Sequence, residues 1–221
     1  MSDYEKMTIV IQNNHEGAGI DISYSDGTMQ HKQIPVLSLC RLLSSYGSVF
    51  GESLGQIPNG YVNAEYSSNK NYSVVLRSPA LSCPVQFMGR VYESIPYPAL
   101  VFRLKFRAGL LYDSSVWAMN KSGALCRYPF GNVYNDGRGR ICWGGYQHQE
   151  VFSLKDSEKT VWKFYELPTN NDLWEESNVN HNVGVLSNMY DMLNNKQEFP
   201  DEWLVPMDIS LDNLLGGLKN E

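Results

Sequence analysis

Residues 125–144, LCRYPFGNVYNDGRGRICWG, decide how this sequence is interpreted, because they place one cysteine at the end of a glycine-rich loop. Asp136-Gly137 supplies the turn chemistry that such a loop needs. Ile141 and Trp143 flank Cys142 with apolar side chains that would anchor the loop. The pattern predicts that the Cys142 thiol is held in a fixed position rather than at the mobile tip of a loop.

A thiol that carries out nucleophilic chemistry needs a fixed position and donors for the oxyanion that forms during acyl transfer. The side chain of Asn132 offers amide N–H groups without adding charge, so it is the candidate donor. Arg138 and Arg140 would favour the thiolate, although loop arginines are often simply solvated. The loop therefore predicts acyl transfer at Cys142.

The four cysteines, Cys40, Cys83, Cys126 and Cys142, show no CxxC spacing, which argues against a metal site or a disulfide framework. Reduced thiols in the cytoplasm are the expectation, with Cys40 and Cys83 in structural roles. Two rival readings stay open. Cys126 and Cys142 would form a redox pair, or His148 would act as the base of a Cys-His hydrolase.

Hydrophobic periodicity around the loop predicts an α+β fold in which helices accompany an antiparallel meander. Strands are expected at Met7–Gln12, Gly19–Tyr24, Met29–Ile34, Tyr72–Arg77, Val101–Phe106 and Leu110–Met119. Helices are expected at Val36–Tyr46, Val151–Glu166 and Val183–Asn194, and a loop at Gly47–Tyr61. Prolines at Ser78-Pro79 and Cys83-Pro84 are expected to break the chain.

The 221 residues carry a net charge of -6 that is divided unevenly. Residues 1–140 hold 13 basic and 10 acidic side chains, whereas residues 141–221 hold 5 and 14. The acidic C-terminal part argues against nucleic acid as a partner, and no apolar run approaches the length of a membrane span. We expect a single domain over 1–221, with 1–50 as an N-terminal elaboration and 168–221 as an acidic helical part.

The order Asn132–Gly137 (NVYNDG) followed by Arg140-Ile141-Cys142 resembles the active-site region of ubiquitin-conjugating enzymes. That family reads His-Pro-Asn, then Ile/Val-Tyr, an Asp/Asn-Gly turn and Ile/Val-Cys-Leu. With the strand start at Tyr97-Pro98 and the segment Val116–Ala118, the whole pattern resembles prokaryotic ubiquitin-conjugating-like family D, which includes protein B of the PRTRC plasmid-associated gene set. The resemblance is best over Pro84–Gly145.

The resemblance implies a ubiquitin-conjugating enzyme-like fold and a bacterial cysteine acyltransferase. Cys142 would accept a ubiquitin-like protein from an activating enzyme as a thioester and pass it to an amine. Asn132 would stabilise the oxyanion or hold the loop that does so, and Asp136 would orient the amine. The implied partners are the activating enzyme, the ubiquitin-like protein and a JAB-family metalloprotease of the same gene set, with neither a cofactor nor a metal required.

Three departures from the family pattern bear on this reading. Phe130-Gly131 stands where His-Pro is usual, and Trp143 stands where leucine is usual. The span from Asn132 to Cys142 is two residues longer than in the eukaryotic pattern, an insertion expected at Arg138-Gly139.

The alternative to an enzyme is a module of this fold that binds a ubiquitin-like protein without catalysis.

Overall fold

The computed structural model describes residues 4–11, 18–24, 26–34, 59–68, 70–151, 153–194 and 196–216. The chain divides into two compact units, Met1–Ser53 and Leu54–Glu221. The predicted helix Val36–Tyr46, including Cys40, lies outside the described residues, as does most of the predicted loop Gly47–Tyr61. The prediction of one domain with elaborations at both ends stays a prediction.

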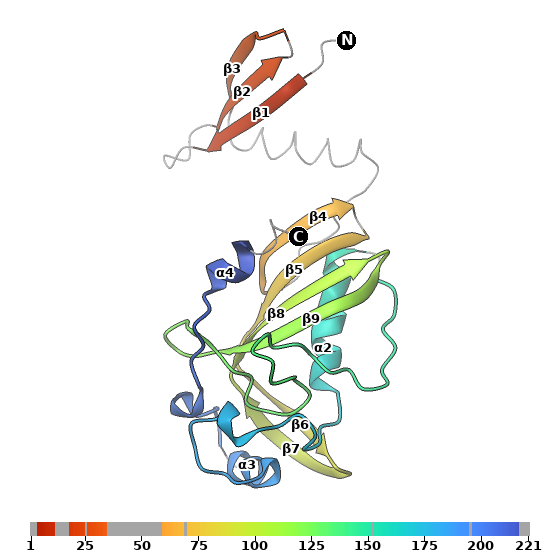
Figure 1. Cartoon of the computed structure of the whole chain (residues 1–221), viewed down its shortest axis with the longest axis vertical. Coiled ribbons are helices and arrows are strands. Elements are labelled where there is room, and N and C mark those ends of the chain that lie inside the picture. Colours follow the sequence, from red (N-terminus) through yellow and green to blue (C-terminus); the bar gives the residue numbers. More distant parts are fainter. Residues whose placement is uncertain are drawn as a thin grey trace. The chain divides into compact units, whose positions relative to one another are not determined.

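The first unit contains a three-stranded antiparallel sheet (Figure 1) in the order β1 (Tyr4–Ile11), β2 (Ala18–Tyr24) and β3 (Met29–Ile34). The turn between β2 and β3 uses Gly27 in the left-handed region, with φ of 82°. All three strands were expected from the sequence, although β1 begins three residues earlier than predicted.

The second unit is built on a five-stranded antiparallel sheet with the order β10-β9-β8-β5-β4 (Figure 1). The strands are β4 (Tyr61–Ser68), β5 (Asn71–Ser78), β8 (Ala99–Arg107), β9 (Leu110–Met119) and β10 (Leu125–Cys126). The sequence predicted β5, β8 and β9, and the bounds of β9 agree with the prediction residue for residue. It missed β4, which lies at the edge of the sheet.

A second hairpin, of β6 (Leu81–Phe87) and β7 (Arg90–Tyr97), extends the pairing of β5 with β8 past a bend. The expected chain break at Cys83-Pro84 is therefore wrong, because the strand runs through both residues. A register shift between Cys83 and Val85 accommodates Pro84 within the ladder.

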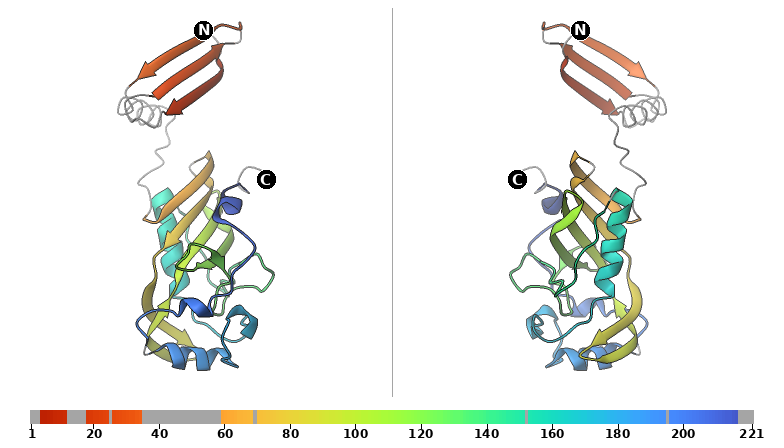
Figure 2. Two further views of the ribbon diagram at one scale, coloured as in Figure 1. Left: turned by 90° about the vertical axis from the view of Figure 1, so that its left-hand side faces the viewer. Right: turned by 90° about the vertical axis from the view of Figure 1, so that its right-hand side faces the viewer.

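Helices cover both faces of the five-stranded sheet (Figure 2). On one face, a short 3₁₀ turn η1 (Leu154–Asp156) leads into α2 (Ser157–Tyr165), which packs on the strands through Val161 and Phe164. On the other face, α4 (Leu211–Gly216) packs through Leu214. The fold is thus an antiparallel meander flanked by helices, which confirms the predicted α+β class.

The remaining elements lie between these two helices in the sequence. They are the 3₁₀ turns η2 (Glu176–Asn178) and η3 (Asp201–Trp203) and the helix α3 (Leu186–Leu193), which contacts β7. The helix predictions Val151–Glu166 and Val183–Asn194 are confirmed with shorter bounds. In the described part of the chain, no helix has the length and apolar character needed to cross a membrane.

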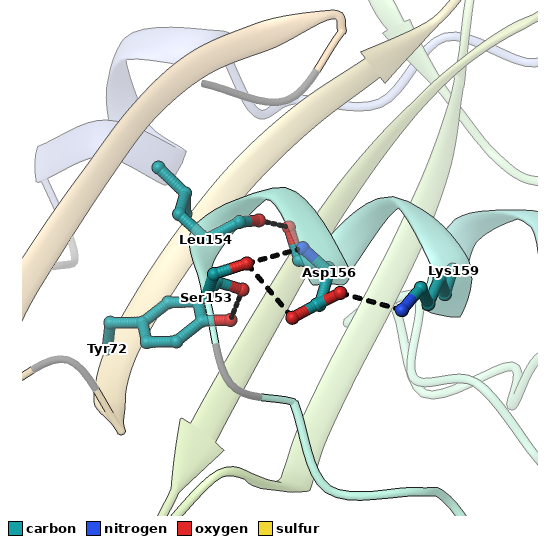
Figure 3. Close-up of polar contacts among 6 residues, drawn as sticks. Tyr72, Ser153, Leu154, Asp156 and Lys159 are labelled. Carbon is teal, nitrogen blue, oxygen red and sulfur yellow. Dashed lines mark hydrogen bonds and ion pairs between the residues drawn. The ribbon is translucent and has the colours of Figure 1, made fainter. Parts of the chain in front are cut away.

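The start of α2 is fixed by a polar cluster shown in Figure 3. Ser153 caps η1 by accepting a hydrogen bond from the Asp156 backbone N–H, and the Tyr72 hydroxyl donates to the Ser153 carbonyl at 3.2 Å. Asp156 also pairs with Lys159 at 2.7 Å. These contacts tie the helix to β5, and α2 in turn supplies one wall of the site described below.

Candidate functional site

The loop that carries Cys142 is folded back on itself as an irregular hairpin. Val133 and Ile141 form an antiparallel bridge, and the Cys142 backbone N–H donates to the Asn132 carbonyl at 2.8 Å. A turn over residues 135–138 closes the hairpin. The longer loop therefore does not separate Asn132 from the cysteine.

The same loop is attached to the edge of the five-stranded sheet. The Val116 N–H donates to the Gly139 carbonyl at 2.8 Å, and the Ile141 N–H donates to the Ser114 carbonyl at 3.0 Å. The Trp143 indole N–H donates to the Ser114 hydroxyl at 2.8 Å. These bonds anchor both sides of Cys142 to β9, so the thiol sits on a fixed support, as the flanking apolar residues led us to expect.

Cys142 is half-buried and opens into a groove of about 460 Å³. Residues 143–146 line the groove, and Lys163 and Glu166 contribute from the end of α2. The segment after α2 completes the lining with Leu167, Pro168, Asn170, Asp172 and Leu173. Asn132 lines the groove beside the thiol. The volume of the groove leaves room for a substrate chain beside Cys142.

The Asn132 side chain joins two walls of this groove. Its Nδ2 donates to the Pro168 carbonyl at 3.0 Å. Its backbone lies in the left-handed region with φ of 67°, which asparagine tolerates better than most residues. One amide N–H is thus committed to holding the loop after α2, while the other remains for a ligand.

Asp136 has a different environment from the one expected of a residue that orients an amine. Its carboxylate pairs with Arg140 at 2.5 Å and accepts the Arg138 backbone N–H at 2.9 Å, and it does not line the groove. Burial raises the pKa of Asp136, but the hydrogen bond and charge of Arg140 outweigh it and bring that pKa below its usual value.

Asp172 and Glu166 are the carboxylates that do line the groove with Cys142. Asp172 is fixed by Asn170, which accepts from the Asp172 backbone N–H at 2.9 Å and donates to the Asp172 carboxylate at 2.9 Å. Glu166 pairs with Lys163 at 3.0 Å. Sequence reasoning missed these residues because only the fold brings the segment after α2 to the thiol.

Packing explains why Phe130 and Gly131 occupy the positions where the family motif has His-Pro. Phe130 is fully buried among aromatic rings, stacked on Tyr190 at 5.5 Å and tilted against Tyr97 at 4.7 Å. At Gly131, an added Cβ would lie 2.8 Å from the Asn170 carbonyl oxygen. A proline cannot occupy this position without displacing the loop that lines the groove.

The other described cysteines lack the setting of Cys142. Cys126 is fully buried and its thiol donates to the Ala124 carbonyl, while burial raises its pKa. Burial raises the pKa of Cys83 to about 11. Both environments favour the unreactive thiol.

His148 does not line the groove. Its ring meets Trp143 edge-on at 4.2 Å and Tyr146 edge-on at 5.0 Å, and burial lowers its pKa. It therefore serves as a packing partner of the groove wall in this structure.

Within the described ranges, no group of three or more His, Cys, Asp or Glu side chains is arranged to hold a metal ion.

An antiparallel meander with flanking helices, and a cysteine on a loop next to an asparagine, define the class of ubiquitin-conjugating (E2)-like domains. A comparison with protein-family models matches residues 43–207, most of the chain, to prokaryotic E2 family D. The chain belongs to this family, as the sequence motifs predicted. Comparisons with curated proteins and with solved structures found no match.

Proposed function

We propose that this protein is a ubiquitin-conjugating-like acyltransferase whose nucleophile is Cys142. The observation that carries the proposal is the place of Cys142. The residue is half-buried and lines the groove, and its backbone N–H donates a hydrogen bond to the Asn132 carbonyl. Family membership supports a role in conjugation. The two other described cysteines are held in environments that suppress their reactivity.

The first step is transthioesterification. An activating enzyme would present the carboxyl-terminal residue of a ubiquitin-like protein as a thioester. The Cys142 thiolate attacks the thioester carbon, a new C–S bond forms, and the activating enzyme's thiolate leaves with the electron pair of the broken C–S bond. The uncommitted N–H of Asn132 is available to the oxyanion of this step.

The groove suits the extended tail of such a modifier. Gly144 and Gly145 form part of its wall, and an added Cβ at either would meet no atom within 4 Å. Small residues in a wall let a backbone approach closely. A flexible carboxyl-terminal tail would therefore lie along residues 143–146 with its last carbonyl at Cys142.

The second step is transfer to an amine, for which the groove supplies carboxylates. Asp172 is fixed by two hydrogen bonds to Asn170 and faces the same groove as the thiol. It is better placed than Asp136 to orient a cationic amine and to accept its proton, since the Asp136 carboxylate is already occupied by Arg140.

We place both steps in the bacterial cytoplasm, and a JAB-family metalloprotease remains a predicted partner.

A charging reaction tests the proposal. The protein is incubated with ATP, a candidate activating enzyme and a candidate ubiquitin-like protein, and the products are separated on a non-reducing gel. We expect a thiol-sensitive adduct that is absent in Cys142→Ala and present in the matched variant Cys83→Ala. An adduct that survives in Cys142→Ala would overturn the assignment of the nucleophile.

Two other outcomes would replace the proposed function. Binding of the ubiquitin-like protein without any adduct would indicate a non-catalytic module. Cleavage of a preformed conjugate that depends on both Cys142 and His148 would indicate a hydrolase.

A further inference from the structure

A second cavity lies beside the loop that carries Cys142, and we call it the loop pocket. Its volume is about 50 Å³, which leaves room for a small polar group, since a single water needs about 10–15 Å³. Five segments meet in it, namely β9, the segment after β10, the Cys142 loop, η2 and the segment before α4. Among the described residues, none lines both the loop pocket and the groove of Cys142.

The floor of the loop pocket contains a hydrogen-bond donor. Trp117 is 3% exposed, and its indole Nε1 is buried without a hydrogen-bond partner in the described part of the chain. An added Cβ at Gly139, which also lines the pocket, would lie 3.0 Å from Nε1 and 3.1 Å from Cε2 of Trp117. The N–H edge of the indole ring therefore faces Gly139. A buried donor that lacks an acceptor is costly, so this N–H marks a place for an acceptor.

Two other tryptophans show how an indole N–H is usually satisfied in this chain. Trp143 donates to the Ser114 hydroxyl at 2.8 Å, and Trp174 donates to the Pro129 carbonyl at 3.0 Å. Trp117 differs from both, because the described residues offer it no acceptor. An acceptor for Trp117 would have to enter through the loop pocket.

The loop pocket also carries a positive charge. Arg127 is exposed and lines the pocket, and its Nη1 makes a long hydrogen bond of 3.5 Å to the Ser177 hydroxyl. That hydroxyl donates to the Glu175 carboxylate at 3.3 Å. Neither Glu175 nor any other carboxylate of the described residues lines the pocket, so its lining has one positive charge and no negative charge.

A buried amide adds to the set of donors. Asn178 lines the pocket and is 4% exposed. Its Nδ2 donates to the Asn135 side-chain oxygen at 2.9 Å, which leaves the second amide hydrogen of Asn178 for another acceptor. The pocket thus combines an indole N–H, an amide N–H and a guanidinium.

We propose that the loop pocket is a binding site for a carboxylate. One carboxylate oxygen accepts from the Trp117 indole N–H in the floor, and the other pairs with the Arg127 guanidinium. An ionised carboxylate has acceptors alone, which matches a pocket whose buried, unpaired group is a donor. Its single negative charge matches one arginine, whereas a phosphate group carries up to about two negative charges.

This site goes beyond the proposed function, because it uses neither Cys142 nor its groove. The two cavities are nevertheless linked by one side chain. Asn135 lines the loop pocket, and its Nδ2 donates to the carbonyl of Leu173, which lines the groove, at 2.8 Å. A bound carboxylate would lie next to the side chain that joins the Cys142 loop to the groove wall.

NMR spectroscopy of the indole N–H groups tests the site without any partner protein. The full chain is labelled with ¹⁵N, the Trp117 indole resonance is assigned in the wild-type protein, and sodium acetate is titrated against sodium chloride at equal ionic strength and pH. We expect acetate to move the Trp117 indole proton downfield and to saturate at millimolar concentrations. The Trp143 and Trp174 resonances should stay in place, because their N–H groups are already bonded. No saturable shift of Trp117, or the same shift with chloride alone, would overturn the proposal.

Two arginines provide a matched pair of variants. Arg127→Gln removes the charge from the loop pocket and should weaken acetate binding about tenfold or more. Arg138→Gln removes another exposed charge, from the Cys142 loop, but Arg138 does not line the pocket. The affinity of that variant for acetate should stay close to that of the wild type. Equal weakening in both variants would show a response to the general charge of the region and would overturn the site.

A comparison of carboxylates then identifies the source of the ligand. A glutamate that is acetylated at its amino group and amidated at its α-carboxyl presents its carboxylate as a protein side chain does. Tighter binding of this blocked glutamate than of acetate would assign the pocket to an acidic side chain of a partner protein, and the reverse would assign it to a small free acid. Inorganic phosphate that binds more tightly than either would overturn the choice of a carboxylate.

Discussion

The Asn132 backbone lies in the left-handed region, and its side chain donates a hydrogen bond across the groove. Asparagine suits both properties, because it tolerates that backbone conformation and its amide can donate. The sequence singled out Asn132 and Cys142 as candidates because they lie with the turn residues in one continuous stretch, and both residues line one groove in the structure. The sequence was not sufficient to select Asp172, which is thirty residues from Cys142 and reaches the groove only through the packing of α2 and the loop after it. Local patterns do not report such long-range proximity.

Variants of Asn132 test its role in holding the groove. Asn132→Gly keeps the left-handed backbone and loses only the bond to Pro168, so we expect a loss of about 1 kcal/mol in the free energy of unfolding. Asn132→Asp places a carboxylate against the Pro168 carbonyl and should cost about 1–3 kcal/mol. Urea denaturation measures both. Wild-type stability in the aspartate variant would show that the bond to Pro168 does not hold this wall.

At the scale of elements, the support for the thiol is the segment of residues 139–141, which is hydrogen-bonded to β9 and bridges Ser115 through Arg140. The regular strands β5, β8 and β9 were predictable because their apolar residues follow the strand period over many positions. The hairpin of β6 and β7 was not, since the proline signal in β6 is overridden by a register shift that only the pairing reveals.

Two glycines of the loop form a matched pair that tests the attachment of this segment to β9. Gly137 and Gly139 both have positive φ, 73° and 65°, so alanine costs about 1–2 kcal/mol at either. An added Cβ meets nothing at Gly137 but lies 2.6 Å from the Val116 carbonyl oxygen at Gly139. We expect Gly139→Ala to destabilise the protein by about 1–3 kcal/mol more than Gly137→Ala in urea denaturation. Equal losses would contradict the close approach of the loop to β9.

At the scale of the whole molecule, the site depends on the aromatic core of the second unit. Phe130 contacts rings from β7, from α3 and from the C-terminal segment, including Tyr97, Tyr190 and Phe199. The loop that carries Asn132 therefore begins inside the core. The predicted fold class and family were recognisable from the sequence, but the burial of the residue at the usual histidine position was not.

Substitution of Phe130 tests this connection between core and site. Phe130→Ala should lower the free energy of unfolding by about 3–5 kcal/mol. Phe130→His restores the usual residue of the motif but buries an imidazole among aromatic rings, so we expect it to be destabilising as well. Denaturant unfolding that finds Phe130→His as stable as wild type would contradict the packing described.

The stability of the molecule should also depend on pH through His148, whose pKa is lowered by burial. Above pH of about 6.5 the imidazole is neutral in both states and contributes no pH dependence. As the pH falls below that value, the unfolded chain binds a proton that the folded protein resists, so stability decreases. His148→Phe should flatten this part of the stability curve, and an unchanged slope between pH 7 and 5 would show that His148 is not its source.

The central claim is that Cys142 forms a covalent thioester, and the chemistry of its serine variant tests this most directly. The wild-type protein is charged with the activating enzyme, ATP and the ubiquitin-like protein, and intact-protein mass spectrometry follows the product. We predict one adduct with the summed mass less one water, released by thiols. Cys142→Ser should give an adduct of the same linkage type that resists thiols and yields to alkali, as an oxyester does. Failure of the wild-type protein to form any adduct, or an adduct that persists in Cys142→Ala, would contradict the account.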